Sequence, residues 1–196
     1  MPKYLIIIGP SGAGKTTVIK QLLKKPLFEL SVSYTTRKPR PGEQSGVQYC
    51  FTTEEDFEKK IKENFFLEYT EFNGCKYGTP CQNDDPDKIV IYDIEIDGFK
   101  FFKKFCSRSF FCLIKINRGT IESRLRKRMM SCVEDESLFD ESEFNTRMEA
   151  YDSYAQIESE YTFDYVVDNS GTIEDTFKQI EELADKAIDH FKILVD

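Results

Sequence analysis

The feature that most constrains the fold lies near the start of the chain, where an apolar run at residues 4–8 leads directly into a glycine-rich loop. Residues 9–16 read Gly-Pro-Ser-Gly-Ala-Gly-Lys-Thr and match the pattern G-x-x-x-x-G-K-[ST]. The apolar run is typical of a strand buried in a parallel sheet, and residues 16–25 have a helical pattern that ends before Pro26. Strand, loop and helix in this order predict a phosphate site, because loop N–H groups and the positive helix end face the same anion.

Seven loop residues are the predicted contacts of the nucleotide phosphates: Ser11, Gly12, Ala13, Gly14, Lys15, Thr16 and Thr17. Lys15 can bridge the β- and γ-phosphates, and the Thr16 hydroxyl can coordinate Mg²⁺, the expected cofactor. ATPases, GTPases and small-molecule kinases all use such a loop, so the motif alone does not name the acceptor.

The remaining pattern alternates strands with helices. Apolar runs at residues 89–93, 111–116 and 165–167 are predicted strands. From Thr172 onward apolar residues recur at three- and four-residue steps, which predicts an amphipathic helix with Thr172 as its N-cap and Asp175 three residues further on. We therefore expect a three-layer α/β/α fold with a parallel central sheet, and the length of 196 residues suits one domain.

Composition excludes several classes of protein. There are 27 Lys and Arg against 35 Asp and Glu, a net charge of −8, which argues against a nucleic-acid-coating protein but not against a small basic pocket. No apolar run approaches the roughly 20 residues of a membrane-spanning helix, and no secretory signal is evident, so we expect a cytoplasmic protein with no membrane partner. The six cysteines, without a C-x-x-C pair, are expected to be mostly buried hydrophobes, and the single histidine, His190, disfavours a histidine-based metal or triad site.

Two regions interrupt the alternation and carry further motifs. Residues 31–43 read Ser-Val-Ser-Tyr-Thr-Thr-Arg-Lys-Pro-Arg-Pro-Gly-Glu, and additional blocks follow at residues 46–51, 66–69 and 74–79. Together with the phosphate loop, and in this order, these blocks strongly resemble the guanylate kinase family over nearly the whole chain.

The resemblance implies a P-loop nucleoside monophosphate kinase. Its reaction would be the reversible, Mg²⁺-dependent transfer of the γ-phosphate of ATP to GMP, and also to dGMP, giving ADP and GDP for purine nucleotide metabolism. ATP and GMP would be its partners, with no nucleic acid, and the chain would act as a monomer. The implied organisation is a single domain with a core at residues 1–31, 81–120 and 150–196, a small mixed-β GMP-binding region at 32–80 and a helical lid at 121–149.

The resemblance also assigns nine residues to GMP: Ser33, Arg37, Arg40, Tyr49, Glu68, Tyr77, Thr79, Asp93 and Glu95. Arginine forks and tyrosine hydroxyls suit a phosphate dianion. A carboxylate at Glu68 accepts the adjacent N1–H and N2–H₂ donors of guanine, a pair that adenine lacks. Thr79 stands where the family more usually has serine, and Glu95 occupies the second acidic place of the family's Asp-x-Asp-x-x-Gly.

Asp93 and Glu95 are expected to share one face of a strand. At the ligand edge of the sheet they would hold Mg²⁺-bound waters, Asp93 together with Thr16, and anchor the phosphate arginines or guanine.

For ATP, the resemblance points to lid arginines. Arg124 and Arg128 lie four residues apart on one helix face and, with Arg147, would close on the triphosphate. The predicted catalytic residues are therefore Lys15, Arg37, Arg124, Arg128 and Arg147. Asn169 corresponds to a family asparagine near adenine. No general base is required, because the attacking phosphate is already anionic.

Other interpretations stay open at this point. The chain can be a guanylate-kinase-like module that binds a phosphorylated peptide without catalysis, although such modules typically have an eroded phosphate loop. It can also be a kinase for another phosphorylated acceptor. Residue by residue, Arg37 and Arg40 can be solvated loop charges, Tyr49 and Tyr77 core aromatics, and Glu68 a surface charge. The lid arginines can equally pair with the acidic run that follows them at residues 134–143.

Overall fold

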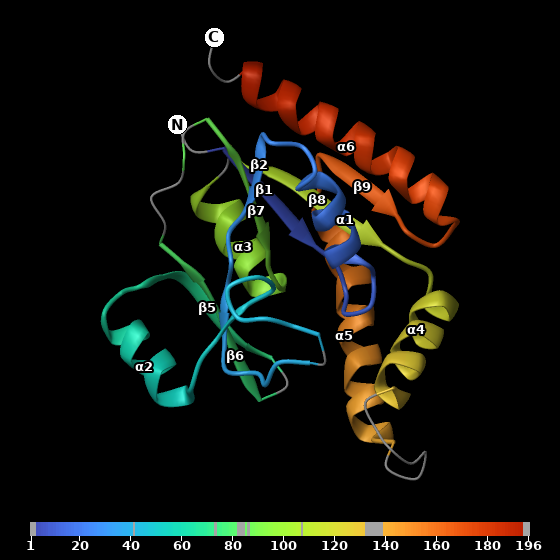
Figure 1. Ribbon diagram of the computed structural model, residues 1–196. Helices are drawn as coiled ribbons and strands as arrows, with labels where there is room; N and C mark the ends of the chain where they lie inside the picture. The colour runs from blue at the N-terminus through green and yellow to red at the C-terminus, as the bar shows by residue number, and fades with distance from the viewer. Residues whose placement is uncertain are drawn as a thin grey trace. The chain divides into compact units, whose positions relative to one another are not determined.

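The computed structural model describes residues 3–40, 42–72, 74–81, 85, 87–106, 108–131 and 139–193 (Figure 1). The elements follow one another as β1 (Lys3–Ile8), α1 (Lys15–Leu22), β2 (Phe28–Leu30), β3 (Tyr34–Thr35), β4 (Cys50–Phe51), α2 (Glu54–Lys62), β5 (Phe66–Phe72), β6 (Cys75–Pro80), β7 (Ile89–Asp93), α3 (Ile96–Phe105), β8 (Phe110–Lys115), α4 (Arg118–Met130), α5 (Glu141–Glu160), β9 (Tyr165–Asp168) and α6 (Ile173–Ile193). Strands alternating with helices confirm the predicted α/β class.

The central sheet has the strand order β2-β7-β1-β8-β9. Strand β2 pairs with β7 in parallel, and β8 pairs with β9 in parallel with Leu113 opposite Val166. The middle strand β1 is completely buried from Leu5 to Ile8, which explains its uninterrupted apolar run. The chain divides into two compact units, one formed by Met1–Ile6 and Leu23–Ser109, the other by Ile7–Leu22 and Phe110–Asp196.

The first unit contains a second sheet in the order β4-β3-β6-β5, the small mixed-β insertion that was expected. Strand β3 pairs with β4 in parallel, whereas β6 runs antiparallel to both β3 and β5. Helix α2 begins at the N-cap Thr53, whose hydroxyl accepts the N–H of Asp56. Its buried Phe57 stacks on Phe66 of β5 with ring centroids 4.6 Å apart, so aromatic packing joins this helix to the sheet.

The second unit holds the phosphate loop between β1 and α1. Helix α6 packs against α1 and against β9, and α4 packs against α5 (Figure 1). The Thr172 hydroxyl accepts the N–H of Asp175 at 3.2 Å, so the predicted cap of α6 is confirmed. Helix α1 ends at Leu22, three residues earlier than predicted. Proline restricts the residue directly before it, so Pro26 accounts for Lys25 lying outside the helix.

Other sequence-based expectations need adjustment. Helix α4 begins at Arg118 rather than at 121, and the expected lid boundary at residue 149 falls inside α5. The expectation that most cysteines are buried is wrong for the five that the structure describes, all of them free: only Cys112 is buried. Cys132 and residues 134–138 of the acidic run lie outside the described residues. Within the described residues, no helix is long and apolar enough to cross a membrane.

Candidate functional site

The phosphate loop turns tightly before it enters α1. The N–H of Ala13 donates to the carbonyl of Pro10 at 3.0 Å, and the first helical bonds run from Thr17 and Val18 to the carbonyl of Gly14. The Lys15 ammonium folds back onto the carbonyl of Gly9 at 2.6 Å. Helix α1 has no acidic residue in its first turn, so its positive end keeps its attraction for an anion.

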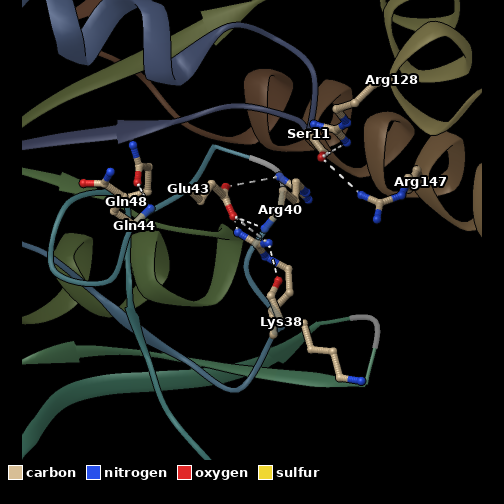
Figure 2. A network of polar contacts seen from close by, with 9 residues as sticks. Ser11, Lys38, Arg40, Glu43, Gln44, Gln48, Arg128 and Arg147 are labelled. Carbon is tan, nitrogen blue, oxygen red and sulfur yellow. Dashed lines mark hydrogen bonds and ion pairs between the residues drawn. The ribbon is translucent and has the colours of Figure 1, made fainter. Parts of the chain in front are cut away.

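Lid arginines converge on this loop within the second unit. Figure 2 shows Arg128 of α4 and Arg147 of α5 directed at Ser11, whose hydroxyl oxygen lies 2.9 Å from Nη2 of the former and 3.3 Å from Nη1 of the latter. Arg124 of α4 donates to the backbone carbonyl of Asn169 at 3.3 Å. Of the three arginines predicted to act on the triphosphate, two therefore contact the phosphate loop and the third contacts Asn169.

Arginines of α4 and α5 also form ion pairs with acidic residues, mainly at Arg126, which is not one of the three predicted arginines. Arg126 pairs with Glu141 and Glu122, and its guanidinium lies 4.0 Å from the centroid of the Phe144 ring. Arg147 shares its guanidinium between Ser11 and Glu143, four residues earlier on α5. Pairing with acidic neighbours thus accounts for Arg126 but not for the contacts of Arg128 with the phosphate loop.

A cationic and phenolic cluster forms in the first unit. The Arg37 guanidinium lies 5.4 Å from the Tyr49 ring centroid, and the Tyr49 and Tyr77 rings meet edge to face at 5.9 Å. Burial raises the pKa of Tyr49 well above its ordinary value, and the charges of Asp93 and Glu95 add to this effect. Burial likewise raises the pKa of Tyr77, so both phenols stay protonated and can donate hydrogen bonds to a phosphate.

Glu43 holds this cluster from the loop side, a contact that the motif analysis missed. Its carboxylate pairs with Arg37 Nη1 at 3.0 Å and Nη2 at 3.1 Å. It also accepts the backbone N–H of Arg40 at 2.7 Å; Figure 2 labels Glu43 and Arg40. Burial alone would lower the pKa of Arg37, but the bond and the charge of Glu43 outweigh it and raise that pKa. An acidic residue three positions after Arg40 is the available sequence signal for this support.

The proposed base-reading residues lie on the paired strands β5 and β6. Glu68 stands opposite Thr79, whose hydroxyl donates to Glu68 Oε1. The register of the pair shifts between Phe66 and Glu68, an irregularity of the kind that re-aims side chains. Burial raises the pKa of Glu68, and the charges of Asp97 and Glu95 act in the same direction against the Thr79 bond. Ser33 is buried directly before β3, the strand that pairs with β6.

Asp93 and Glu95 are brought near the cluster by different elements than predicted. Asp93 is the last residue of β7, but Glu95 is the N-cap residue of α3 and does not belong to the strand. The prediction that they share one strand face is therefore wrong, because the chain turns into a helix after Asp93. The charge of Glu95 still raises the pKa of Tyr49 and Tyr77 in the phenolic cluster and of Glu68 on β5.

Gly98 of α3 is a second residue that the motif analysis did not single out as functional. A Cβ atom at this position would lie 3.1 Å from both Cδ and Oε2 of Glu68. The glycine therefore leaves room for the carboxylate beside the first turn of α3, and it is the last residue of the predicted acidic motif.

These features define a phosphate-binding-loop kinase: a glycine loop with a lysine and converging arginines, and a separate set of residues suited to a phosphorylated acceptor. Residues 1–187 match the family model described as guanylate kinase. Among similar proteins are guanylate kinases of Prochlorococcus marinus, 42% identical over 133 residues, or 64% of this chain and 72% of that protein, and of Clostridium perfringens, 38% identical over 186 residues, or 91% and 81%. A solved guanylate kinase of Anaplasma phagocytophilum shares the fold, with a TM-score of 0.67 and 24% identity over 95% of this chain and 84% of that one.

The chain belongs to the guanylate kinase family. It is accordingly a transferase of the nucleoside monophosphate kinase type, and the comparisons support this kinase function rather than the non-catalytic binding module.

Proposed function

We propose that this protein transfers the γ-phosphoryl group of ATP to GMP, and also to dGMP, reversibly and with Mg²⁺, giving ADP and GDP. The observation that carries the choice of acceptor is the Glu68–Thr79 pair on β5 and β6, in the same unit as the Arg37, Tyr49 and Tyr77 cluster. A carboxylate that is held in place accepts two adjacent donors, which guanine offers and adenine does not. Arg37, Arg40 and the two phenols would hold the GMP phosphate.

The donor side of the reaction relies on charge and position. The loop N–H groups and Lys15 would hold the ATP phosphates, and Arg128 and Arg147, now on Ser11, would move to the charge that develops on the transferring group. The attacking GMP oxygen is already anionic, so no residue needs to remove a proton. Thr16 is exposed at the start of α1, and its hydroxyl suits Mg²⁺, which when bound neutralises phosphate charge.

Cytoplasmic location and a monomeric state belong to the same proposal. Both substrates are small and water-soluble, and the acidic exterior implied by a net charge of −8 suits a freely diffusing protein. Sedimentation at several protein concentrations checks the monomeric state.

The acceptor assay tests the reaction directly. Purified protein with Mg·ATP is offered GMP, dGMP, AMP, CMP or UMP at equal concentration, and ADP release is followed with coupling enzymes. We expect turnover with GMP and dGMP, and rates with AMP lower by about 10⁴-fold, because AMP leaves the half-buried Glu68 carboxylate without the two guanine donors. Absence of turnover with GMP, or equal turnover with AMP, contradicts the proposal.

Lys15→Ala provides the internal test of the phosphate loop. We expect kcat with GMP to fall by about 10²–10³-fold, the usual cost of removing one charge-stabilising donor, while the thermal unfolding curve stays close to that of the original protein. Lys20→Ala removes an equal charge from the exposed side of α1 and serves as the matched control. Equal rates for both variants would show that Lys15 takes no part in transfer.

A further inference from the structure

A buried polar pair connects helix α6 to the phosphate loop. Asn169, 5% exposed, follows β9, and its Nδ2 donates to the backbone carbonyl of Ala13 at 2.7 Å. Its Oδ1 lies 2.9 Å from the hydroxyl of Thr176, which is completely buried in the first turn of α6. Both ends of the amide thus have protein partners, and one of them is the loop that binds phosphate.

The contact with the loop is close enough to restrict its sequence. A Cβ atom at Gly14 would lie only 2.2 Å from Asn169 Nδ2, and Gly14 has a φ of +101°. The amide therefore occupies the space that any side chain at position 14 would need.

The bond to Ala13 has a directional consequence for phosphate binding. In a planar trans peptide the C=O and the following N–H point in opposite directions. The carbonyl of Ala13 and the N–H of Gly14 belong to one peptide plane. Pinning this carbonyl on the Asn169 side therefore turns the Gly14 N–H to the opposite side, away from the protein partner and available to an anion.

Thr176 supplies the partner of the other end of the amide. The Ala13 carbonyl can only accept, so Nδ2 must face it, and Oδ1 then needs a donor in a buried environment. The Thr176 hydroxyl is that donor, with the carbonyl of Thr172 as a second acceptor at 3.0 Å. A flipped amide would place two acceptors together at Ala13, which is why the amide keeps this orientation.

We propose that Thr176 and Asn169 are positioning residues for the nucleotide-phosphate site: the Thr176 hydroxyl anchors the Oδ1 end of the Asn169 amide, and the amide holds the Ala13–Gly14 peptide in its anion-binding direction. The proposal rests on the proposed function only in that the loop binds a nucleotide phosphate. In this proposal Asn169 acts on the backbone of the phosphate loop. Its support comes from Thr176 of α6, a helix that contributes no residue to the predicted site.

The first experiment compares Thr176→Val with Thr176→Ser. Valine keeps the shape of threonine but removes the donor, whereas serine keeps the donor. Binding of Mg·ADP is measured by calorimetry, and backbone hydrogen exchange is measured over residues 10–17. We expect Thr176→Val to weaken Mg·ADP binding about tenfold, the effect of one lost buried hydrogen bond, and to speed exchange in this segment. Thr176→Ser should restore both.

Thr172→Val is the matched control, because it removes the cap of α6 and leaves the Thr176–Asn169 bond untouched. It should lower the thermal stability without changing Mg·ADP binding or loop exchange. Equal weakening by Thr172→Val, or Mg·ADP binding by Thr176→Val within twofold of the original protein, would overturn the proposal.

Asn169→Asp gives a readout that a purely structural residue would not produce, and it applies even if Thr176→Val does not fold. The carboxylate cannot donate to Ala13, but the protonated acid can. We expect Mg·ADP binding, relative to the original protein at each pH, to be weakest at high pH and to recover as the pH falls. A ratio that stays flat with pH would overturn the proposal. If Mg·ADP binds as expected but GMP is not phosphorylated, the proposed acceptor is wrong and the positioning role stands.

Discussion

At the scale of single residues, Glu68 illustrates a conflict between stability and function. Its pKa is raised because burial disfavours the charged form, and the neighbouring Asp97 and Glu95 carboxylates add to this. Its contribution to folding is therefore fully present below the unfolded pKa and is lost as the pH rises through the folded pKa. Above its folded pKa, Glu68 is ionised at a cost to the free energy of unfolding.

Glu68→Gln should separate these two effects. The amide keeps an oxygen for the Thr79 hydroxyl but cannot accept both guanine donors, so we expect KM for GMP to rise by about 10- to 100-fold. The free energy of unfolding should rise relative to the original protein, and this gain should increase as the pH is raised from the acid range. Kinetics with GMP and urea unfolding at several pH values provide the measurements. An unchanged KM, or a variant that is less stable at neutral pH, would contradict the assignment.

At the scale of elements, helix α3 connects the acidic motif at residues 93–98 to strand β5, which carries Glu68. Its N-cap residue Glu95 raises the pKa of three site residues, and its Asp97 accepts a hydrogen bond from Thr70 of β5 at 3.0 Å. Gly98 follows, where the Glu68 carboxylate approaches the helix backbone. The first turn of α3 thus places the carboxylates of Glu95 and Asp97 near Glu68 and, at Gly98, leaves room for the Glu68 side chain.

Gly98→Ala should exchange function for helix stability. Alanine in a helix is favoured over glycine by roughly 0.5–1 kcal/mol, but its Cβ would lie 3.1 Å from the Glu68 carboxylate and displace it. We expect KM for GMP to rise at least about fivefold with a change in unfolding free energy within about 1 kcal/mol. Gly119→Ala in α4 is the matched control, because its nearest neighbour would be Asn117 Oδ1 at 3.8 Å. An equal effect of both substitutions on KM would refute the close approach.

At the scale of the whole molecule, a net charge of −8 coexists with a local cluster of cations, formed by Lys15, Arg124, Arg128 and Arg147. The residues proposed for GMP lie in the unit formed by Met1–Ile6 and Leu23–Ser109, and the phosphate loop and lid arginines lie in the other. Each set is held by contacts within its own unit, such as Glu43 with Arg37 and Ser11 with Arg128. The overall charge therefore describes the exterior and not the site chemistry.

This division predicts that each nucleotide stabilises the protein on its own. At 100 times its Kd, a ligand that binds only the folded state adds about 2.7 kcal/mol to the free energy of unfolding. The midpoint temperature of thermal unfolding should therefore rise with GMP alone and with Mg·ATP alone. Glu68→Gln should remove most of the GMP shift and keep the Mg·ATP shift, and Lys15→Ala should do the reverse. Loss of both shifts in either variant would contradict independent binding.

Local patterns predicted much of the fold. The phosphate loop, the strand–helix alternation and the cap of α6 depend on residues a few positions apart, so their backbone geometry follows from spacing and residue type. The turn after Asp93 escaped prediction because an acidic alternating stretch suits both a strand and a helix start. The expectation of buried cysteines was wrong at Cys81, which is exposed, because the burial of a single position is decided by packing and not by residue type.

The sequence by itself thus determined which groups are available: a glycine-rich loop of the phosphate-binding pattern, arginines and tyrosines that we propose for a second phosphate, and a carboxylate that we propose for guanine. Only the tertiary structure decided how the polar groups pair. Glu43 holds Arg37, Thr79 donates to Glu68, and Asn169 bonds Ala13 across 156 positions of the chain. The physical reason is that hydrogen bonds act over about 3 Å, and for residues far apart in sequence that distance is set by the packing of strands and helices.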